Sequence, residues 1–81
     1  MAVRAYILLT VKSGTERRVC DKLREHNEVL EANELYGEYD IIVKVHAEDL
    51  SQLDDLLTRK IRSNSSILLT YTMIIARSHK S

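Results

Sequence analysis

The sequence predicts an α+β fold in which two helices cover one side of a four-stranded antiparallel sheet. Three observations lead to this class. The 81 residues are too few for two hydrophobic cores, so residues 1–81 are expected to form a single domain. β-like runs and amphipathic helical patterns follow in the order strand, helix, strand, strand, helix, strand. One of only two glycines, Gly37, stands where the two halves of this order join.

The first strand is expected over residues 3–12, where alternation separates an apolar face from a mixed one. The apolar face consists of Val3, Ala5, Ile7, Leu9 and Val11. The residues that follow are polar and break this period. Ser13 with Glu16 three residues later matches a capping box, and Thr15 is a competing N-cap, so a helix is expected to begin here.

The first helix is expected over residues 15–26, because Val19 and Leu23 share one face and charged residues cover most of the rest. Cys20 falls on the same apolar side and is the only cysteine, so it cannot form an intramolecular disulfide. A reactive thiol would need a neighbouring base and an electropositive opening, for which the sequence gives no support. We therefore expect a buried thiol.

The second and third strands are expected to form a hairpin around Gly37. Residues 29–36 alternate weakly, which suits an edge strand. Residues 40–47 suit a central strand, because one face is wholly apolar. A glycine allows the positive φ that a tight reversal requires. Two tyrosines and an aspartate crowd onto this turn, so a recognition role for its tip stands beside the plain turn role.

The second helix is expected over residues 50–62, after a capping signal from Asp49 and Gln52. Its predicted buried stripe consists of Leu50, Leu53, Leu57 and Ile61. The last strand is expected over residues 67–77. Right-handed crossovers leave a gap within each βαβ half that the other half fills, so the predicted strand order is 4-1-3-2. This arrangement is the ferredoxin-like βαββαβ fold.

The side of this sheet away from the helices is predicted to be an exposed apolar surface. Burying roughly 500 Å² of it at about 25 cal/mol per Å² would contribute roughly 12 kcal/mol before the cost of association. We therefore expect a homodimer with sheets packed face to face across a two-fold axis. The predicted dimer face consists of Tyr6, Leu8, Thr10, Ile42, Lys44 and His46.

Composition and motifs argue against several other function classes. A formal net charge of zero argues against sequence-independent nucleic-acid binding. No apolar run approaches the roughly 20 residues of a membrane span, and the N-terminus lacks a signal-peptide layout, so a cytoplasmic protein is expected. The three histidines fall in different elements, so no metal site is expected. Without a phosphate-binding loop, nucleophile elbow or catalytic acid pair, neither a cofactor nor catalysis is predicted.

An RNA-recognition domain shares the predicted element order, but it stacks bases on aromatic residues of its central strands. The third strand here, DIIVKVHA, has no aromatic residue. Tyr6 alone could not take that role.

Four features occur in a specific order along the chain. They are AYILLTVKSG near the start, the turn Gly37-Glu38-Tyr39-Asp40 followed by IIVKV, the leucine-spaced second helix, and Thr70-Tyr71-Thr72 ahead of MII. In this order and at these distances, the sequence resembles the effector-binding (RAM) domain of the Lrp/AsnC family of leucine-responsive and asparagine-responsive transcription regulators. The resemblance covers nearly the full length.

The resemblance implies a dimeric α/β barrel that assembles further, to tetramers or octamers, with amino-acid effectors held in clefts between dimers. It assigns effector binding to the turn residues Gly37, Glu38, Tyr39 and Asp40 and to the last-strand residues Thr72 and, as a weaker candidate, Thr70. The amides of a glycine turn can receive a carboxylate. Asp40 could either accept from the ammonium group of the effector or hold the turn.

Full-length members of the family carry an N-terminal helix-turn-helix that binds DNA, whereas this chain begins at the first strand. On the resemblance we expect a stand-alone domain that senses amino acids, or modulates full-length Lrp/AsnC regulators without contacting DNA. Two alternatives stay open. One is a small dimeric ferredoxin-like enzyme, which would need reactive polar groups between helix and sheet. The other is a purely structural assembly module.

Overall fold

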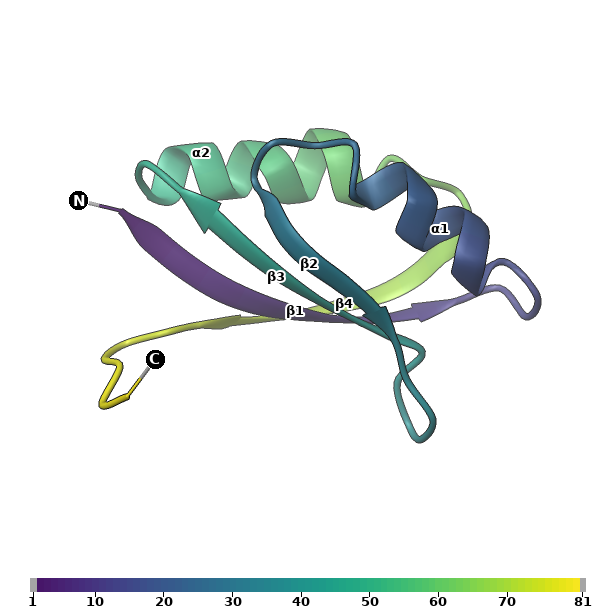
Figure 1. Ribbon diagram of the computed structural model, residues 1–81. Helices are drawn as coiled ribbons and strands as arrows, with labels where there is room; N and C mark the ends of the chain where they lie inside the picture. The colour runs from purple at the N-terminus through teal and green to yellow at the C-terminus, as the bar shows by residue number, and fades with distance from the viewer. Residues whose placement is uncertain (1, 81) are drawn as a thin grey trace.

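A computed structural model describes residues 2–80 and has the predicted βαββαβ order (Figure 1). The elements are β1 (Val3–Val11), α1 (Glu16–Leu23), β2 (Val29–Glu34), β3 (Ile41–Ala47), α2 (Leu50–Asp55), its π-helical continuation η1 (Leu56–Ile61) and β4 (Ile67–Ile74). Each expected element is present. The first helix and the last strand end earlier than predicted.

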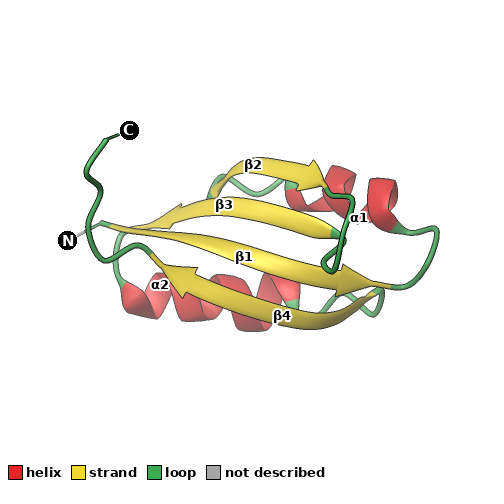
Figure 2. Ribbon diagram, turned by 90° about the horizontal axis from the view of Figure 1, so that it is seen from below, coloured by secondary structure: helices red, strands yellow, loops and turns green. Residues whose placement is uncertain are grey.

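The strands form one antiparallel sheet in the order β2-β3-β1-β4, which is the predicted order read from the other edge. In this sheet Ile7 of β1 lies opposite Val43 of β3 and Thr72 of β4. Both helices lie on one side of the sheet, and the other side is left uncovered (Figures 1 and 2). The ferredoxin-like fold class is therefore confirmed.

The hydrophobic core lies between the sheet and the helices. The central strands supply the faces that alternation predicted, with only Val3 half-buried at the start of β1. The buried strand residues are Ala5, Ile7, Leu9, Val11, Ile41, Val43, Val45 and Ala47. β2 forms one edge of the sheet, as its weak alternation indicated.

Cys20 lies on the buried side of α1, as predicted. Burial raises the pKa of its thiol, and the negative charges of Glu34 and Asp21 raise it further. The thiol therefore stays protonated near neutral pH, which is the inert condition of a structural cysteine.

The second helix differs from the prediction because its C-terminal half is π-helical. The structure buries Leu53, Leu56 and Ile61, whereas Leu57 is half-buried and Leu50 is 61% exposed. Positions 56 and 61 are five apart, which matches the hydrogen-bond spacing of a π-helix, so both side chains reach the core. The predicted stripe was therefore wrong at Leu50 and omitted Leu56, whereas Leu57 packs against the core from a half-buried position.

The two helices begin differently. Asp49 caps α2 as predicted, because its carboxylate accepts a hydrogen bond from the backbone N–H of Gln52 at 2.8 Å. At α1 the predicted capping box of residues 13–16 does not form. Thr15 is the N-cap, but its hydroxyl donates to the carbonyl of Lys12 at 2.6 Å rather than accepting a helix N–H.

Candidate functional site

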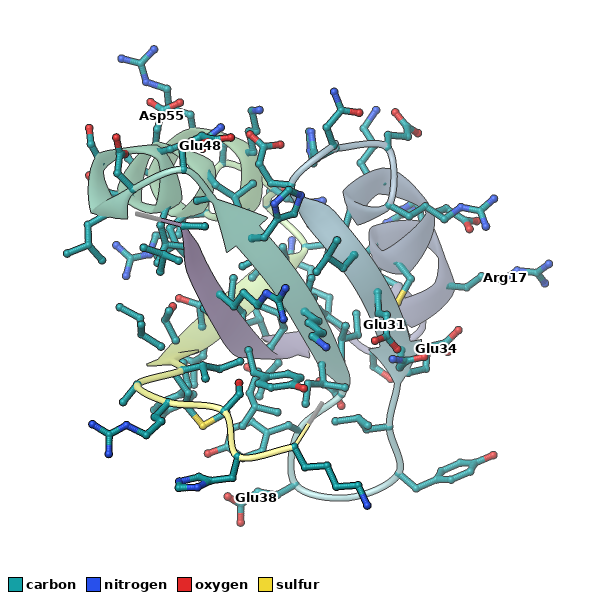
Figure 3. The ribbon with its side chains drawn as sticks, turned by 60° about the vertical axis from the view of Figure 1, so that its left-hand side comes forward. Arg17, Glu31, Glu34, Glu38, Glu48 and Asp55 are labelled. Carbon is teal, nitrogen blue, oxygen red and sulfur yellow. The ribbon has the colours of Figure 1, made fainter. Side chains whose placement is uncertain are left out.

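The β2–β3 hairpin extends from the sheet on the side away from the helices (Figure 1). Its loop is closed by a hydrogen bond of 2.8 Å from the backbone N–H of Leu35 to the carbonyl of Asp40. Gly37 has a φ of 137°, a conformation that side chains with a Cβ rarely adopt. Tyr36 is fully exposed, and Glu38 lies at the far end of the hairpin (Figure 3). The turn predicted at Gly37 is therefore present.

Asp40 fixes the base of this hairpin to β1. Its backbone N–H donates to the carbonyl of Leu9 at 2.9 Å. Its carboxylate Oδ2 accepts from the backbone N–H of Val11 at 2.8 Å, in a partly buried position. The side chain thus continues the β1–β3 hydrogen bonding beyond the start of β3. Asp40 was expected either to bind the ammonium group of an effector or to hold the turn. Its hydrogen bonds to β1 correspond to the second role.

Tyr39 joins the hairpin to β4. Its ring meets the ring of Tyr71 edge-on, with centroids 5.5 Å apart and planes at 76°. Tyr71 lies opposite Leu8 on β1. Because the buried β1 residues next to Leu8 point toward the helices, Tyr71 and the hairpin lie on the uncovered side of the sheet.

The uncovered side carries all six residues of the predicted dimer face. Tyr6 lies opposite Lys44, whose ammonium group is 5.8 Å from the centre of the tyrosine ring. β4 adds three exposed apolar residues to this side, and they were not part of the predicted dimer face: Leu69, Tyr71 and Met73. Together they make an apolar surface of the kind that marks association sites.

Thr70 and Thr72 lie on the opposite side of the sheet from the hairpin. They stand opposite Leu9 and Ile7, whose side chains are buried beneath the helices. Both threonines border a groove of about 470 Å³ between β4 and the second helix, which we call the α2–β4 groove. Its lining consists of Leu50, Leu53, Asp54, Leu57, Arg62, Thr70, Thr72 and Ile74.

The helical wall of the α2–β4 groove follows from helix geometry. Leu50, Asp54 and Leu57 are spaced at i, i+4 and i+7, so they share one face. Arg62 reaches the groove at the end of the π-helical turn, where its backbone N–H donates to the carbonyl of Leu57 at 2.8 Å. Sequence analysis missed these residues as site candidates, because their position depends on how the second helix packs against β4.

The groove holds two opposite charges without partners. Across residues 2–80, neither the carboxylate of Asp54 nor the guanidinium of Arg62 takes part in an ion pair or a side-chain hydrogen bond. The neighbouring Asp55 differs, because Arg59 pairs with it at 3.0 Å. Asp54 and Arg62 are therefore free to meet a ligand.

The residues predicted to bind an effector thus form two groups within one chain. The hairpin group, residues 37–40, lies on the uncovered side, and the threonines lie in the α2–β4 groove on the helix side. A site that contains both groups requires two copies of the chain.

A second hollow, of about 440 Å³, lies between the α1–β2 loop, the end of β3 and the second helix. Its lining is wholly polar. There Lys60 contacts the carboxylate of Glu28 at 2.9 Å, and this hydrogen bond lowers the pKa of Glu28. His26 and His46 border the hollow, but nowhere in residues 2–80 are three metal-ligating side chains grouped to hold a metal. The Lys60–Glu28 pair gives this hollow a structural role.

Within the same described part of the chain, no helix has the length and apolarity needed to cross a bilayer.

A family model described as the Lrp/AsnC ligand binding domain matches residues 4–81. Among curated proteins, the HTH-type transcriptional regulator FL11 of Pyrococcus furiosus is 33% identical over 78 residues, which cover 96% of this chain and 51% of the relative. Its counterpart from Pyrococcus abyssi is 34% identical over 76 residues, 94% of this chain and 50% of that protein. The chain therefore spans about half the length of the curated relatives it matches.

Solved structures agree with this assignment. The crystal structure of FFRP-DM1 is 48% identical with a TM-score of 0.88, covering 90% of this chain and 97% of that one. PHS023 from Pyrococcus horikoshii is 47% identical with a TM-score of 0.89, covering 95% and 93%. AsnC of E. coli is 29% identical with a TM-score of 0.92, covering 98% of this chain and 54% of that one. The chain belongs to the Lrp/AsnC family, as a ligand-binding domain of the RAM type.

Proposed function

We propose that this chain is an amino-acid-binding and oligomerisation domain. It senses amino acids, modulates full-length Lrp/AsnC regulators by assembling with them, or does both. The observation that carries the proposal is the α2–β4 groove, whose lining brings Thr70 and Thr72 together with the unpaired charges of Asp54 and Arg62. An amino acid presents the ammonium and carboxylate groups that such a pair of charges can bind.

The proposed effector site is shared between copies of the chain. The groove of one copy supplies Thr70 and Thr72, and the hairpin of another closes over it with residues 37–40. The exposed position of the hairpin supports this arrangement, and so does the open space around Gly37, where no atom lies within 4 Å of an added Cβ. Amides at such a glycine turn can receive a carboxylate.

The proposed assembly begins with a homodimer through the uncovered face of the sheet. The exposed apolar residues of β4 enlarge the face predicted from Tyr6, Leu8 and Ile42. Contacts between hairpin and groove would then join dimers into tetramers or octamers. We expect the chain to act beside transcription regulators and therefore in the cytoplasm. This proposed role involves no enzymatic activity.

Thermal shift against the twenty amino acids, with light scattering on the same samples, tests the proposal. At a hundredfold excess over Kd, a bound effector adds about 2.7 kcal/mol to the free energy of unfolding. Thr72→Val keeps the side-chain shape but removes the hydroxyl, so we expect a weaker response without a lower melting temperature of the free protein. Thr58→Val is the matched control, since Thr58 is exposed on the second helix outside the groove.

The alternative functions predict different outcomes of these two measurements. If no amino acid raises the melting temperature and the oligomer size stays constant, effector binding is refuted and a structural assembly module remains. A monomer at all concentrations would refute the proposed dimer through the uncovered face.

A further inference from the structure

We infer that Tyr71 is a positioning residue, which holds the β2–β3 hairpin in place from the uncovered face of the sheet. Because the same side chain belongs to the dimer face, dimer formation and the order of the hairpin depend on one another. The inference rests on the proposed function, since it concerns the homodimer and the hairpin named there. It follows from how the hairpin is attached, where Tyr71 lies and how much of its ring stays open.

The hairpin is attached to the rest of the fold at its base and through one tyrosine ring. At the base, Asp40 makes two hydrogen bonds to β1. Tyr39 reaches farther, because β1 lies between β3 and β4 and the ring meets Tyr71 on β4 at 5.5 Å between centroids. Among the described residues, the tip at residues 36–38 has no side-chain hydrogen bond or ion pair. The Tyr39–Tyr71 contact is therefore the outermost support of the hairpin.

Tyr71 also lies in the middle of the apolar part of β4. Leu69 and Met73 flank it on the same side of the strand, and all three are about half exposed. Tyr71 is still 50% exposed although Tyr39 packs against it, so part of its ring is open to a second copy. Sheets that pack face to face lie about 10 Å apart, and the side chains between them interdigitate. A partner sheet would therefore cover the open part of the Tyr71 ring.

Covering Tyr71 should order the hairpin. Side chains in a packed interior sit in fixed rotamers, so Tyr71 would hold Tyr39 in one position once a partner covers it. An edge-to-face pair of rings contributes the equivalent of about two- to tenfold in an equilibrium constant beyond the area it buries. Coupling is reciprocal, so a fixed hairpin favours the dimer by the same factor. The hydrogen bonds of Asp40 do not involve Tyr71, so the base of the hairpin stays closed in either state.

Two backbone amides of the sheet report on this separately. The N–H of Leu35 donates to the carbonyl of Asp40 at 2.8 Å and closes the hairpin loop. The N–H of His46 donates to the carbonyl of Glu28 at 2.9 Å, at the opposite end of β3. Faster hydrogen exchange at Leu35 alone indicates a loosened hairpin, whereas faster exchange at both amides indicates a less stable sheet.

Hydrogen exchange of the full chain, at a concentration where light scattering shows the dimer, tests the positioning role. Tyr71→Leu keeps an apolar side chain but removes the ring, so Leu35 should exchange about two- to tenfold faster while His46 is unchanged. Tyr71→Phe keeps the ring and should match the unchanged chain. Met73→Leu is the matched control, because Met73 lies on the same face of β4, and it should also leave Leu35 unchanged. Equal exchange at Leu35 in Tyr71→Leu and Met73→Leu would overturn the positioning role.

A double-mutant cycle on the dimer dissociation constant, measured by analytical ultracentrifugation, tests the coupling. Tyr39→Leu should raise this constant about two- to tenfold in the unchanged chain and leave it unchanged in the Tyr71→Leu chain. An equal rise in both chains would mean that Tyr39 contacts the partner directly, and it would overturn the coupling through Tyr71. No rise in either chain would overturn it as well.

The two measurements separate this inference from the proposed function. A chain that stays monomeric at all concentrations would overturn the proposed dimer and the coupling with it, and exchange at Leu35 would still decide whether Tyr71 holds the hairpin. A dimer whose dissociation constant and hairpin exchange ignore the Tyr39–Tyr71 pair would overturn the inference and keep the proposed dimer.

Discussion

Replacing Asp40 by alanine should destabilise the fold at the base of the hairpin. The Asp40 carboxylate accepts the backbone N–H of Val11 at 2.8 Å, and Val11 is only 6% exposed, so water has little access to that N–H. A buried donor left without an acceptor costs about 1–3 kcal/mol. For a domain of this size each kcal/mol lowers the melting temperature by about 4–8 °C. Asp40→Asn keeps an acceptor oxygen and should therefore cost less than half as much as Asp40→Ala.

Thermal unfolding at one fixed protein concentration checks this, since self-association makes the melting temperature depend on concentration. Glu38→Ala is the control: Glu38 is exposed in the same hairpin, and its side chain makes no hydrogen bond within residues 2–80, so its cost should stay within about 0.5 kcal/mol. A melting temperature of Asp40→Ala equal to that of the control would refute the structural role. So would an Asp40→Asn variant that melts as low as Asp40→Ala.

Acid should remove the stability that Glu28 contributes. The hydrogen bond from Lys60 holds the pKa of Glu28 below its ordinary value near 4.5, so this stability is present above that pH and is lost as pH falls through the lowered pKa. Urea unfolding across this pH range should show a smaller loss for Lys60→Met, and an equal loss would count against the pair. Leu56→Ala should cost about 2–5 kcal/mol because Leu56 is completely buried, whereas Leu50→Ala should cost less than about 1 kcal/mol; equal costs in urea unfolding would contradict the π-helical packing. Gly37→Ala should cost about 1–3 kcal/mol from backbone strain alone, since space around it is open; an unchanged melting temperature would show that the turn relaxes.

The sequence predicted the sheet well because β1 and β3 are central strands with wholly apolar core faces. Their alternation admits one register, since a slip of one residue would expose every buried side chain. The second helix was harder to predict. The α-helical stripe through Leu53 and Leu57 leaves out Leu56, whose complete burial accompanies the π-helical turn.

The sequence predicted those parts of the candidate site that depend on neighbouring residues in the chain. Gly37 marked the turn because its backbone conformation requires a glycine. The partner of Asp40 was not predictable, because Val11 is 29 positions away and meets it only through the pairing of β1 with β3. Asp54 and Arg62 were missed for the same reason, since β4 and the second helix create the groove together.

Amide chemical-shift mapping during a titration with the amino acid that raises the melting temperature most tests most directly whether an effector binds between the groove of one copy and the hairpin of another. The expected result is a set of perturbed signals at Thr70 and Thr72 together with the amide of Gly37, two regions that lie on opposite sides of the sheet in one chain. Perturbations confined to the polar hollow around Glu28, or no perturbation by any of the twenty amino acids at saturating concentration, would contradict it.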